Sequence, residues 1–293
     1  MGNKYYFIII FIILLMLILF YILQYLNTRE SFIDALSDAV IYEKKMMALN
    51  PRVVYNTHSQ YQDISVIKFD KNNIGFDKCL MLGDEVQLCD GNEYKYHETI
   101  THVAASYIKN IRNVLIIGGG DCMTLREIMK YPSIQHVVML ELDKKVIDVS
   151  KKYFNSNDYQ DDPRVEIIIG DATKNIDKIK KKFELVIIDT TEDSSNNSPI
   201  DSKEFLKKTF SKVNVNGILV KNGDDMKNFI NISSLANNVK IIKYDEYIWG
   251  ETDYRFIVAS NYINFDESTR YKHDIDLKFY HFNKHENFIF NTD

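Results

Sequence analysis

Residues 114–121, with the sequence VLIIGGGD, predict a buried strand that runs directly into a glycine-rich turn. A continuous apolar run of this kind is typical of a parallel strand covered on both faces. A helix is predicted over residues 125–129, and a second apolar run at 137–140 ends in Glu141. An acid about 20 residues beyond the glycines suits ribose hydroxyls, so the segment predicts the adenosine-binding half of a Rossmann-like domain.

Further apolar runs complete the predicted α/β fold. They recur near positions 114, 137, 165, 185, 218, 241 and 255, and a helix after Tyr96 leads the chain into this region. Short alternating segments between 53 and 89 predict a small antiparallel β-domain instead. The predicted organisation is a transmembrane anchor at 1–28, a connector at 29–52, the β-domain at 53–98 and a methyltransferase-type, Rossmann-like catalytic domain at 99–293.

The N-terminal residues predict a membrane span. Residues 5–26 contain no charged side chain, and about 22 apolar positions suffice to cross a hydrocarbon core. Bulky residues at 21–28 offer no small-residue cleavage site, which favours an uncleaved anchor over a signal peptide. Basic residues from Arg29 onward outnumber Lys4 on the other side, so a single-pass membrane protein with a cytoplasmic catalytic domain is predicted.

Charge and cysteine content narrow the classes of partner. A formal net charge of -5 gives no reason to expect a nucleic-acid partner, because such proteins usually carry a basic face. The three cysteines, Cys79, Cys89 and Cys122, are odd in number and lack the spacing of metal ligands. They predict reduced, mostly buried thiols and no metal site.

Acidic residues follow several predicted strands, at the edge where open α/β sheets bind ligands. Glu141 is a candidate for ribose hydroxyls and Asp171 for the adenine amine, although either could simply cap a helix. Asp121 would repel the carboxylate of ordinary S-adenosylmethionine and attract a decarboxylated donor. Asp189 leaves a buried strand directly and could act as a general base, or lie in a solvated polar turn.

Several motifs together resemble the spermidine synthase family of polyamine aminopropyltransferases. They lie in the family's order between about 61 and 260: YQDI at 61–64, YKYHE at 94–98, GGGD at 118–121, LRE at 125–127, ELD at 141–143, GDA at 170–172 and DTTE at 189–192. The resemblance implies a small β-domain before a Rossmann-like domain, commonly assembled as a homodimer or homotetramer. It also implies transfer of an aminopropyl group from decarboxylated S-adenosylmethionine to putrescine or a related amine, with release of methylthioadenosine and without a metal or other cofactor.

The resemblance also assigns roles to individual residues. Asp189 and Tyr96 would bind and deprotonate the attacking amine, and further acceptor-binding residues would be Glu192, Asn222 and Trp249. The donor would be held by Gln62, His97, Gly118, Gly120, Asp121, Glu141, Asp171 and Ala172. Cys122 and Met123 stand where the family usually has two more glycines, which predicts a narrower donor pocket.

Two other functions stay open at this point. A Rossmann-like methyltransferase would use intact S-adenosylmethionine, which Asp121 disfavours. A catalytically silent, membrane-tethered homologue would keep the fold as a binding or scaffolding protein, since a fold alone does not establish an activity. Against this second alternative, a silent protein has no physical reason to group uncompensated carboxylates at strand ends.

Overall fold

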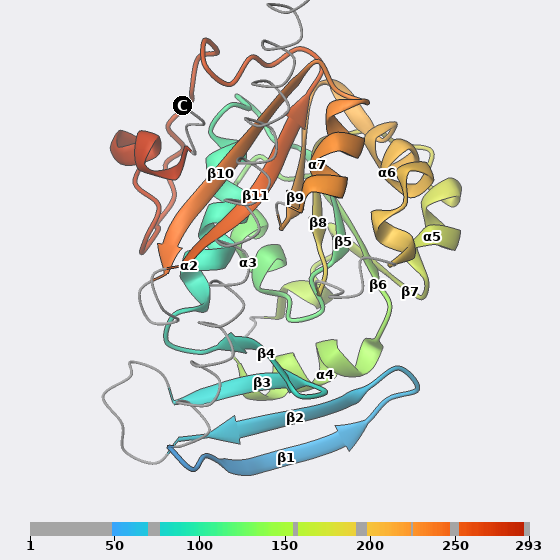
Figure 1. Cartoon of the computed structure of the whole chain (residues 1–293), viewed down its shortest axis with the longest axis vertical. Coiled ribbons are helices and arrows are strands. Elements are labelled where there is room, and N and C mark those ends of the chain that lie inside the picture. Colours follow the sequence, from blue (N-terminus) through green and yellow to red (C-terminus); the bar gives the residue numbers. More distant parts are fainter. Residues whose placement is uncertain are drawn as a thin grey trace, which may run out of the picture. The chain divides into compact units, whose positions relative to one another are not determined.

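A mostly parallel, seven-stranded sheet forms the centre of the computed structural model (Figure 1). The structure describes residues 49–69, 77–154, 158–191, 198–223, 225–246 and 252–289. The strand order is β10-β11-β9-β8-β5-β6-β7, in which β11 runs antiparallel to β9. The strands are β5 (Asn113–Gly118), β6 (His136–Glu141), β7 (Val165–Ile169), β8 (Phe183–Asp189), β9 (Val213–Asn222), β10 (Asn238–Glu246) and β11 (Thr252–Ser260).

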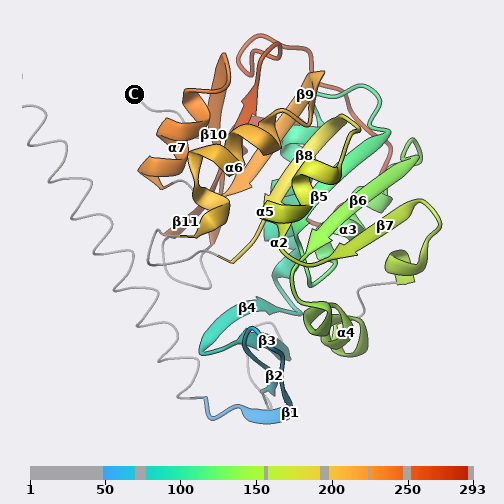
Figure 2. The ribbon, with the colours of Figure 1, turned by 90° about the vertical axis from the view of Figure 1, so that its right-hand side faces the viewer.

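Apolar cores cover both faces of this sheet. Alternate residues of β5 point to opposite sides, so Val114 and Ile116 belong to one core while Leu115 and Ile117 belong to the other. Helix α3 (Met123–Met129) contributes to the first core, together with the segment that follows α2 (Glu93–Glu98). Figures 1 and 2 show the second face covered by α5 (Ala172–Asn175), α6 (Lys203–Phe210) and α7 (Met226–Ser233). These layers make a Rossmann-like α/β fold.

A four-stranded antiparallel sheet precedes the larger one, as the alternating pattern predicts. Its strands, in the order β1-β2-β3-β4, are β1 (Arg52–His58), β2 (Asp63–Lys68), β3 (Lys78–Leu82) and β4 (Glu85–Cys89). Ile64, Val66 and Leu80 pack from this sheet against Met123 of α3 and against the apolar face of α4 (Lys144–Tyr153). The small sheet is therefore held against the helices that follow the glycine turn and Glu141.

Two of the three cysteines are not the reduced thiols that the sequence predicts. Cys79 and Cys89 are opposite each other in the β3–β4 pair, with Cα atoms 4.1 Å apart, and they form a disulfide. Cys122 is the free, buried cysteine. The prediction is wrong for the pair because an odd count does not reveal which two side chains the register of a hairpin brings together.

The C-terminal segment packs on the first core, through η5 (Phe282–Phe288) and the residues before it. Glu98 fixes this segment, because its buried carboxylate accepts hydrogen bonds from the amides of Lys278, Phe279 and Tyr280 at 2.8, 2.7 and 2.8 Å. The remaining short helical elements are η1 (Thr99–Val103), η2 (Asp158–Asp161), η3 (Ile176–Lys178) and η4 (Pro199–Asp201). Of these, η1 is a turn of π-helix that continues α2 directly.

The predicted membrane localisation is wrong by the test that the structure allows. Within the residues that the structure describes, no helix combines the length and the apolar character that a bilayer crossing requires. The predicted span itself, residues 5–26, lies outside the described residues.

Both sheets belong to one structural unit, made of residues 51–245 and 253–293. The domain boundaries that the sequence suggests at residues 28, 52 and 98 stay predictions.

Candidate active site

The carboxyl ends of β5 and β8 lie side by side and bring the glycine turn against Asp189. Gly118 pairs with Asp189 in the parallel register, and the Gly119 amide donates to the Asp189 carbonyl at 2.7 Å. Gly118 has a φ of +81°, and a Cβ at this position would collide with the same carbonyl oxygen. Because glycine alone tolerates both conditions, the turn and this acid are fixed next to each other.

Asp189 has a hydroxyl group on each of its carboxylate oxygens. The Tyr96 hydroxyl donates to Oδ1 at 2.8 Å, and the Thr124 hydroxyl donates to Oδ2 at 2.5 Å. Burial, and after it the neighbouring Asp121 carboxylate, raise the pKa of Asp189 above its ordinary value. The result is a carboxylate with a fixed orientation and increased basicity at the end of a rigid strand.

His97 lies next to this carboxylate and joins α2 to the glycine turn. Its Nδ1 atom is 2.7 Å from the Glu93 carbonyl oxygen and 2.9 Å from Glu93 Oε2, while its Nε2 atom is 3.3 Å from Asp121 Oδ2. Burial alone would lower the pKa of His97, but Asp121 and Glu93 together raise it well above the ordinary value. Asp121 also accepts from the Met123 amide at 2.7 Å through its other oxygen.

An arginine on α3 holds Glu93 from the opposite side. Arg126 Nη1 and Nη2 donate to the two Glu93 oxygens at 2.8 and 2.9 Å, a two-point geometry that fixes the carboxylate strongly. Burial would raise the pKa of Glu93, but His97 and Arg126 lower it to about 2. Glu93, Arg126 and Thr124 are the site residues that sequence analysis missed. The four-residue spacing between Glu93 and His97 is the signal that points to the first of them.

Glu141 is buried at the end of β6, next to the glycine turn. Its Oε1 atom accepts from the Asp143 amide at 2.8 Å, and a Cβ at Gly120 would lie 2.9 Å from its Oε2 atom. Burial, followed by the charges of Asp121 and Asp143, raises the pKa of Glu141 to about 7. The structure thus places Glu141, Gly120 and Asp121 together, as their positions at strand ends predict.

Asp171 caps the helix that follows β7. It accepts from the Thr173 amide at 2.9 Å and from the Thr173 hydroxyl at 2.6 Å, and Ala172 behind it is buried as the first residue of α5. This is the capping role that the sequence leaves open for Asp171. A contact with adenine stays a prediction for both residues.

Gln62 lies in the turn between β1 and β2, where its backbone and the Ser59 side chain are hydrogen-bonded. Lys145 of α4 donates to the carbonyl of His58 at 2.8 Å and so connects this turn to the helix after Glu141. The small sheet therefore brings Gln62 toward the Glu141 side of the site.

Asn222 ends β9, next to β8. Its side-chain Nδ2 atom donates to the Thr190 carbonyl at 2.6 Å, and its buried Oδ1 atom has no hydrogen-bond partner among the described residues. The other two predicted acceptor-binding residues, Glu192 and Trp249, lie outside the described residues.

Cys122 and Met123 are both buried, and the narrower donor pocket that the sequence predicts at these positions stays a prediction. Cys122 has a φ of +64° and is buried in the core shared by α3 and the sheet, where burial raises the pKa of its thiol. Met123 is buried against the small sheet. Both side chains belong to cores, and the Cys122 Sγ atom also lies 3.7 Å from the Gly120 carbonyl oxygen in the turn.

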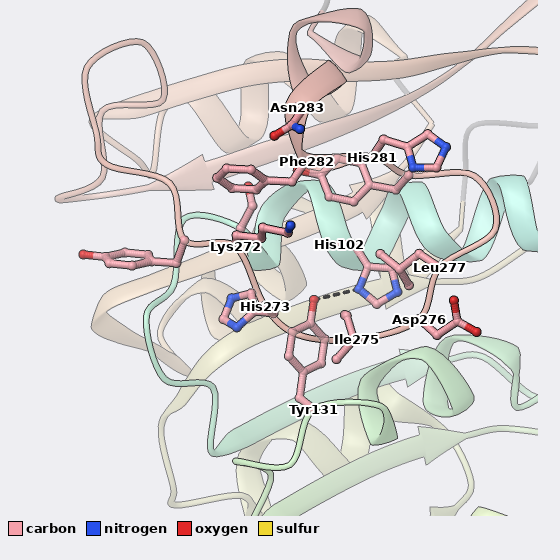
Figure 3. Close-up of a pocket in the computed structure, with 13 residues that line it drawn as sticks. His102, Tyr131, Lys272, His273, Ile275, Asp276, Leu277, His281, Phe282 and Asn283 are labelled. Carbon is pink, nitrogen blue, oxygen red and sulfur yellow. Dashed lines mark hydrogen bonds between the residues drawn. The ribbon is translucent and has the colours of Figure 1, made fainter.

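A cavity of about 250 Å³ lies elsewhere, between η1, the end of α3 and the C-terminal segment (Figure 3). His102 and Tyr131 form part of its wall, and none of the predicted site residues lines it. The Tyr131 hydroxyl donates to His102 Nδ1 at 2.6 Å, and His102 Nε2 donates to Glu127 Oε2 at 2.8 Å. Among the described residues, no group of three or more His, Cys, Asp or Glu side chains is placed to hold a metal ion.

The sheet order and the helices on both faces define a Rossmann-like α/β protein, with acids at the carboxyl edge, where open sheets bind ligands. Solved structures share this fold. A spermidine synthase from Thermotoga maritima superimposes with a TM-score of 0.73 at 24% sequence identity, covering 82% of this chain and 85% of that one. A spermidine synthase in complex with the transition-state analogue AdoDATO matches with the same values.

Sequence comparisons identify the family. The model of the spermine/spermidine synthase domain matches residues 93–245. The polyamine aminopropyltransferase of Hydrogenobaculum sp. is 32% identical over 250 residues, covering 80% of this chain and 86% of that protein. That of Methanocaldococcus jannaschii is 33% identical over 206 residues, covering 69% and 68%. The chain belongs to the spermine/spermidine synthase family.

Proposed function

We propose that this chain transfers an aminopropyl group from decarboxylated S-adenosylmethionine to putrescine or a related amine. The products are a spermidine-type polyamine and methylthioadenosine. Asp189 carries the proposal, because hydroxyls of Tyr96 and Thr124 hold both of its oxygens while its desolvation, and after it Asp121, increase its basicity. The activity named for the relatives, polyamine aminopropyltransferase, supports the same reaction.

The proposed reaction is an in-line displacement. The amine nitrogen attacks the carbon beside the sulfonium, a C–N bond forms as the C–S bond breaks, and the sulfur leaves as a neutral thioether. The amine also loses a proton, which we assign to Asp189, with Tyr96 and Thr124 holding the carboxylate in place. Orientation of the two substrates and removal of this proton supply most of the rate.

For the donor, we assign Asp121 and Gln62 to the aminopropyl end, with His97 as a further polar contact. Glu141 is assigned to the ribose hydroxyls, and Asp171 and Ala172 to adenine. Gly118 and Gly120 allow the backbone of the turn to approach the ligand closely. An acid at position 121 favours a donor that carries an ammonium and no carboxylate at this end.

For the acceptor, we assign Asn222, Glu192 and Trp249 in addition to Asp189 and Tyr96. The unpartnered Oδ1 atom of Asn222 supports a contact with an ammonium group, since a buried acceptor without a partner is costly. We further expect a homodimer or a homotetramer, which light scattering on the purified chain would distinguish.

The two alternatives receive less support. A methyltransferase would have to bind the carboxylate of intact S-adenosylmethionine close to Asp121 and Asp189, which is electrostatically unfavourable. A silent binding protein would have no use for a partly buried carboxylate whose orientation and basicity suit proton abstraction.

The test is release of methylthioadenosine from decarboxylated S-adenosylmethionine by the full chain with a panel of di- and polyamines. Release that depends on one amine names the acceptor, and intact S-adenosylmethionine should give no transfer. In an Asp121→Asn variant the preference for the decarboxylated donor is expected to fall by about tenfold, equivalent to about 1.4 kcal/mol. No release with any amine would contradict the proposed function.

A further inference from the structure

His97 faces hydrogen-bond acceptors on both sides of its ring. The Glu93 carbonyl and carboxylate oxygens lie at Nδ1, and a carboxylate oxygen of Asp121 lies at Nε2. Neither a carbonyl oxygen nor an ionised carboxylate can donate, so each ring nitrogen must carry a proton to satisfy this arrangement. The geometry therefore makes His97 an imidazolium cation before any substrate binds.

The positive charge of His97 offsets the negative charge of Asp121, which would otherwise attract the donor's ammonium. Arg126 and Glu93 form one partly buried ion pair, and His97 and Asp121 form a second. Asp121 then has little net negative charge left to attract the ammonium of a decarboxylated donor. Placing that ammonium beside an imidazolium would also be repulsive.

We propose that the donor's ammonium replaces a proton of His97 when it binds at Asp121, and that Glu93 and Arg126 are positioning residues for this exchange. The neutral ring keeps its Nδ1 proton on Glu93, and the lone pair of Nε2 becomes an acceptor for the ammonium. The proton goes to solvent, so charge is conserved within the site. This inference rests on the proposed function, because it takes the donor's ammonium to lie at Asp121.

The surroundings of His97 are consistent with an exchange at this ring. Glu93 and Tyr96 face it from α2, Asp121 from the glycine turn and Asp189 from β8, while Arg126 of α3 acts through Glu93. The carboxylates favour the charged ring in the empty site. An incoming ammonium changes this balance, because it supplies a second cation to the same two acids, Asp121 and Asp189.

The experiment is calorimetry of decarboxylated S-adenosylmethionine binding to the full chain at pH 7, in phosphate and in Tris buffer. The dependence of the observed enthalpy on the buffer's ionisation enthalpy counts the protons released. Release of about one proton per donor is expected, with affinity that rises about tenfold per pH unit while His97 remains protonated in the free protein. The Glu93→Gln variant should release fewer protons, because it removes one of the two charges that keep His97 protonated.

Two variants show whether the released proton comes from His97. His97→Gln keeps a polar side chain but cannot titrate, so its donor binding should show no dependence on the buffer. His136→Gln alters a histidine at the opposite end of the sheet and should behave as the unaltered chain does. Donor binding without proton release, or release that persists in His97→Gln, overturns the inference while leaving the proposed function intact. No donor binding at all overturns both.

Discussion

His97 and His102 lie on one continuous helical segment and are both buried, but we assign them different charge states, a cation at His97 and a neutral ring at His102. His97 is 3% exposed and His102 is 1% exposed. His97 has acceptors at both nitrogens, whereas His102 accepts from the Tyr131 hydroxyl at Nδ1 and donates to Glu127 at Nε2. Burial lowers the pKa of His102, and Glu127 does not fully offset it. The comparison shows that the donors and acceptors around a buried ring, and not its burial, decide its charge.

The two histidines are also connected. Arg126 donates to both Glu93 and Glu127, so a chain of buried and partly buried hydrogen bonds runs from Asp121 through His97 and Arg126 to His102 and Tyr131. One end of this chain lies at the candidate active site, and the other forms part of the cavity in Figure 3. Each end can be altered independently, which makes the comparison testable.

The largest effect should come from Asp189→Asn. With the donor bound, the lone pair of His97 Nε2 accepts from the donor's ammonium, so His97 cannot take the proton of the attacking amine. The amide at 189 is therefore expected to lower turnover by about 100-fold to 10,000-fold while donor binding persists. Rapid-quench measurement of methylthioadenosine checks the rate, and calorimetry checks the donor. Turnover close to that of the unaltered chain would remove Asp189 from the role of base.

The pH dependence of stability should have opposite signs at the two histidines. Because folding raises the pKa of His97, this residue contributes to the free energy of unfolding. The contribution is complete below pH 6.5 and is lost as the pH rises through the pKa of His97 in the folded protein. The lowered pKa of His102 contributes stability that is present above pH 6.5 and lost as the pH falls. Each slope is at most about 1.4 kcal/mol per pH unit. Urea unfolding from pH 5 to 9 of His97→Gln and His102→Gln, each compared with the unaltered chain, would measure them. Slopes of the same sign would refute the assigned charge states.

The smallest effects are expected for Tyr131, which is hydrogen-bonded to His102, and Tyr96, which is hydrogen-bonded to Asp189. Tyr131→Phe leaves Nδ1 of His102 without its donor and is expected to cost about 1 kcal/mol of unfolding free energy with unchanged turnover. Tyr96→Phe should instead lower turnover, because it removes one of the two hydroxyls that hold Asp189. Thermal unfolding and steady-state kinetics on both variants provide the check. Loss of turnover in Tyr131→Phe would show that the two regions are coupled.

Much of the fold follows from local patterns in the sequence. The apolar runs at 114–117 and 137–140 lie within β5 and β6, and the alternating residues after 53 form the antiparallel sheet. Contacts between residues on different strands or helices are harder to predict from the sequence. The disulfide between Cys79 and Cys89 follows from the register of β3 and β4. Regular counting from the turn at Gly83 would place Leu88 opposite Cys79, and an irregularity between Leu80 and Met81 shifts the partner to Cys89.

The candidate site likewise has features that local sequence patterns predict and features that they do not. Asp121, Glu141 and Asp189 come together because parallel strands deliver their carboxyl ends to one edge, which a sequence reader can anticipate. The partners that set their charges are not visible in any local pattern. Arg126 and Glu93 are 33 positions apart, and only the packing of α3 against α2 joins them.

The buried carboxylate of Glu98 has a consequence for the order in which the protein can be built. Its three amide donors come from residues 278–280, about 180 positions later in the chain. A nascent polypeptide cannot satisfy this carboxylate until those residues have left the ribosome. Because Glu98 directly follows Tyr96 and His97, helix α2 gains its final support only at a late stage of synthesis.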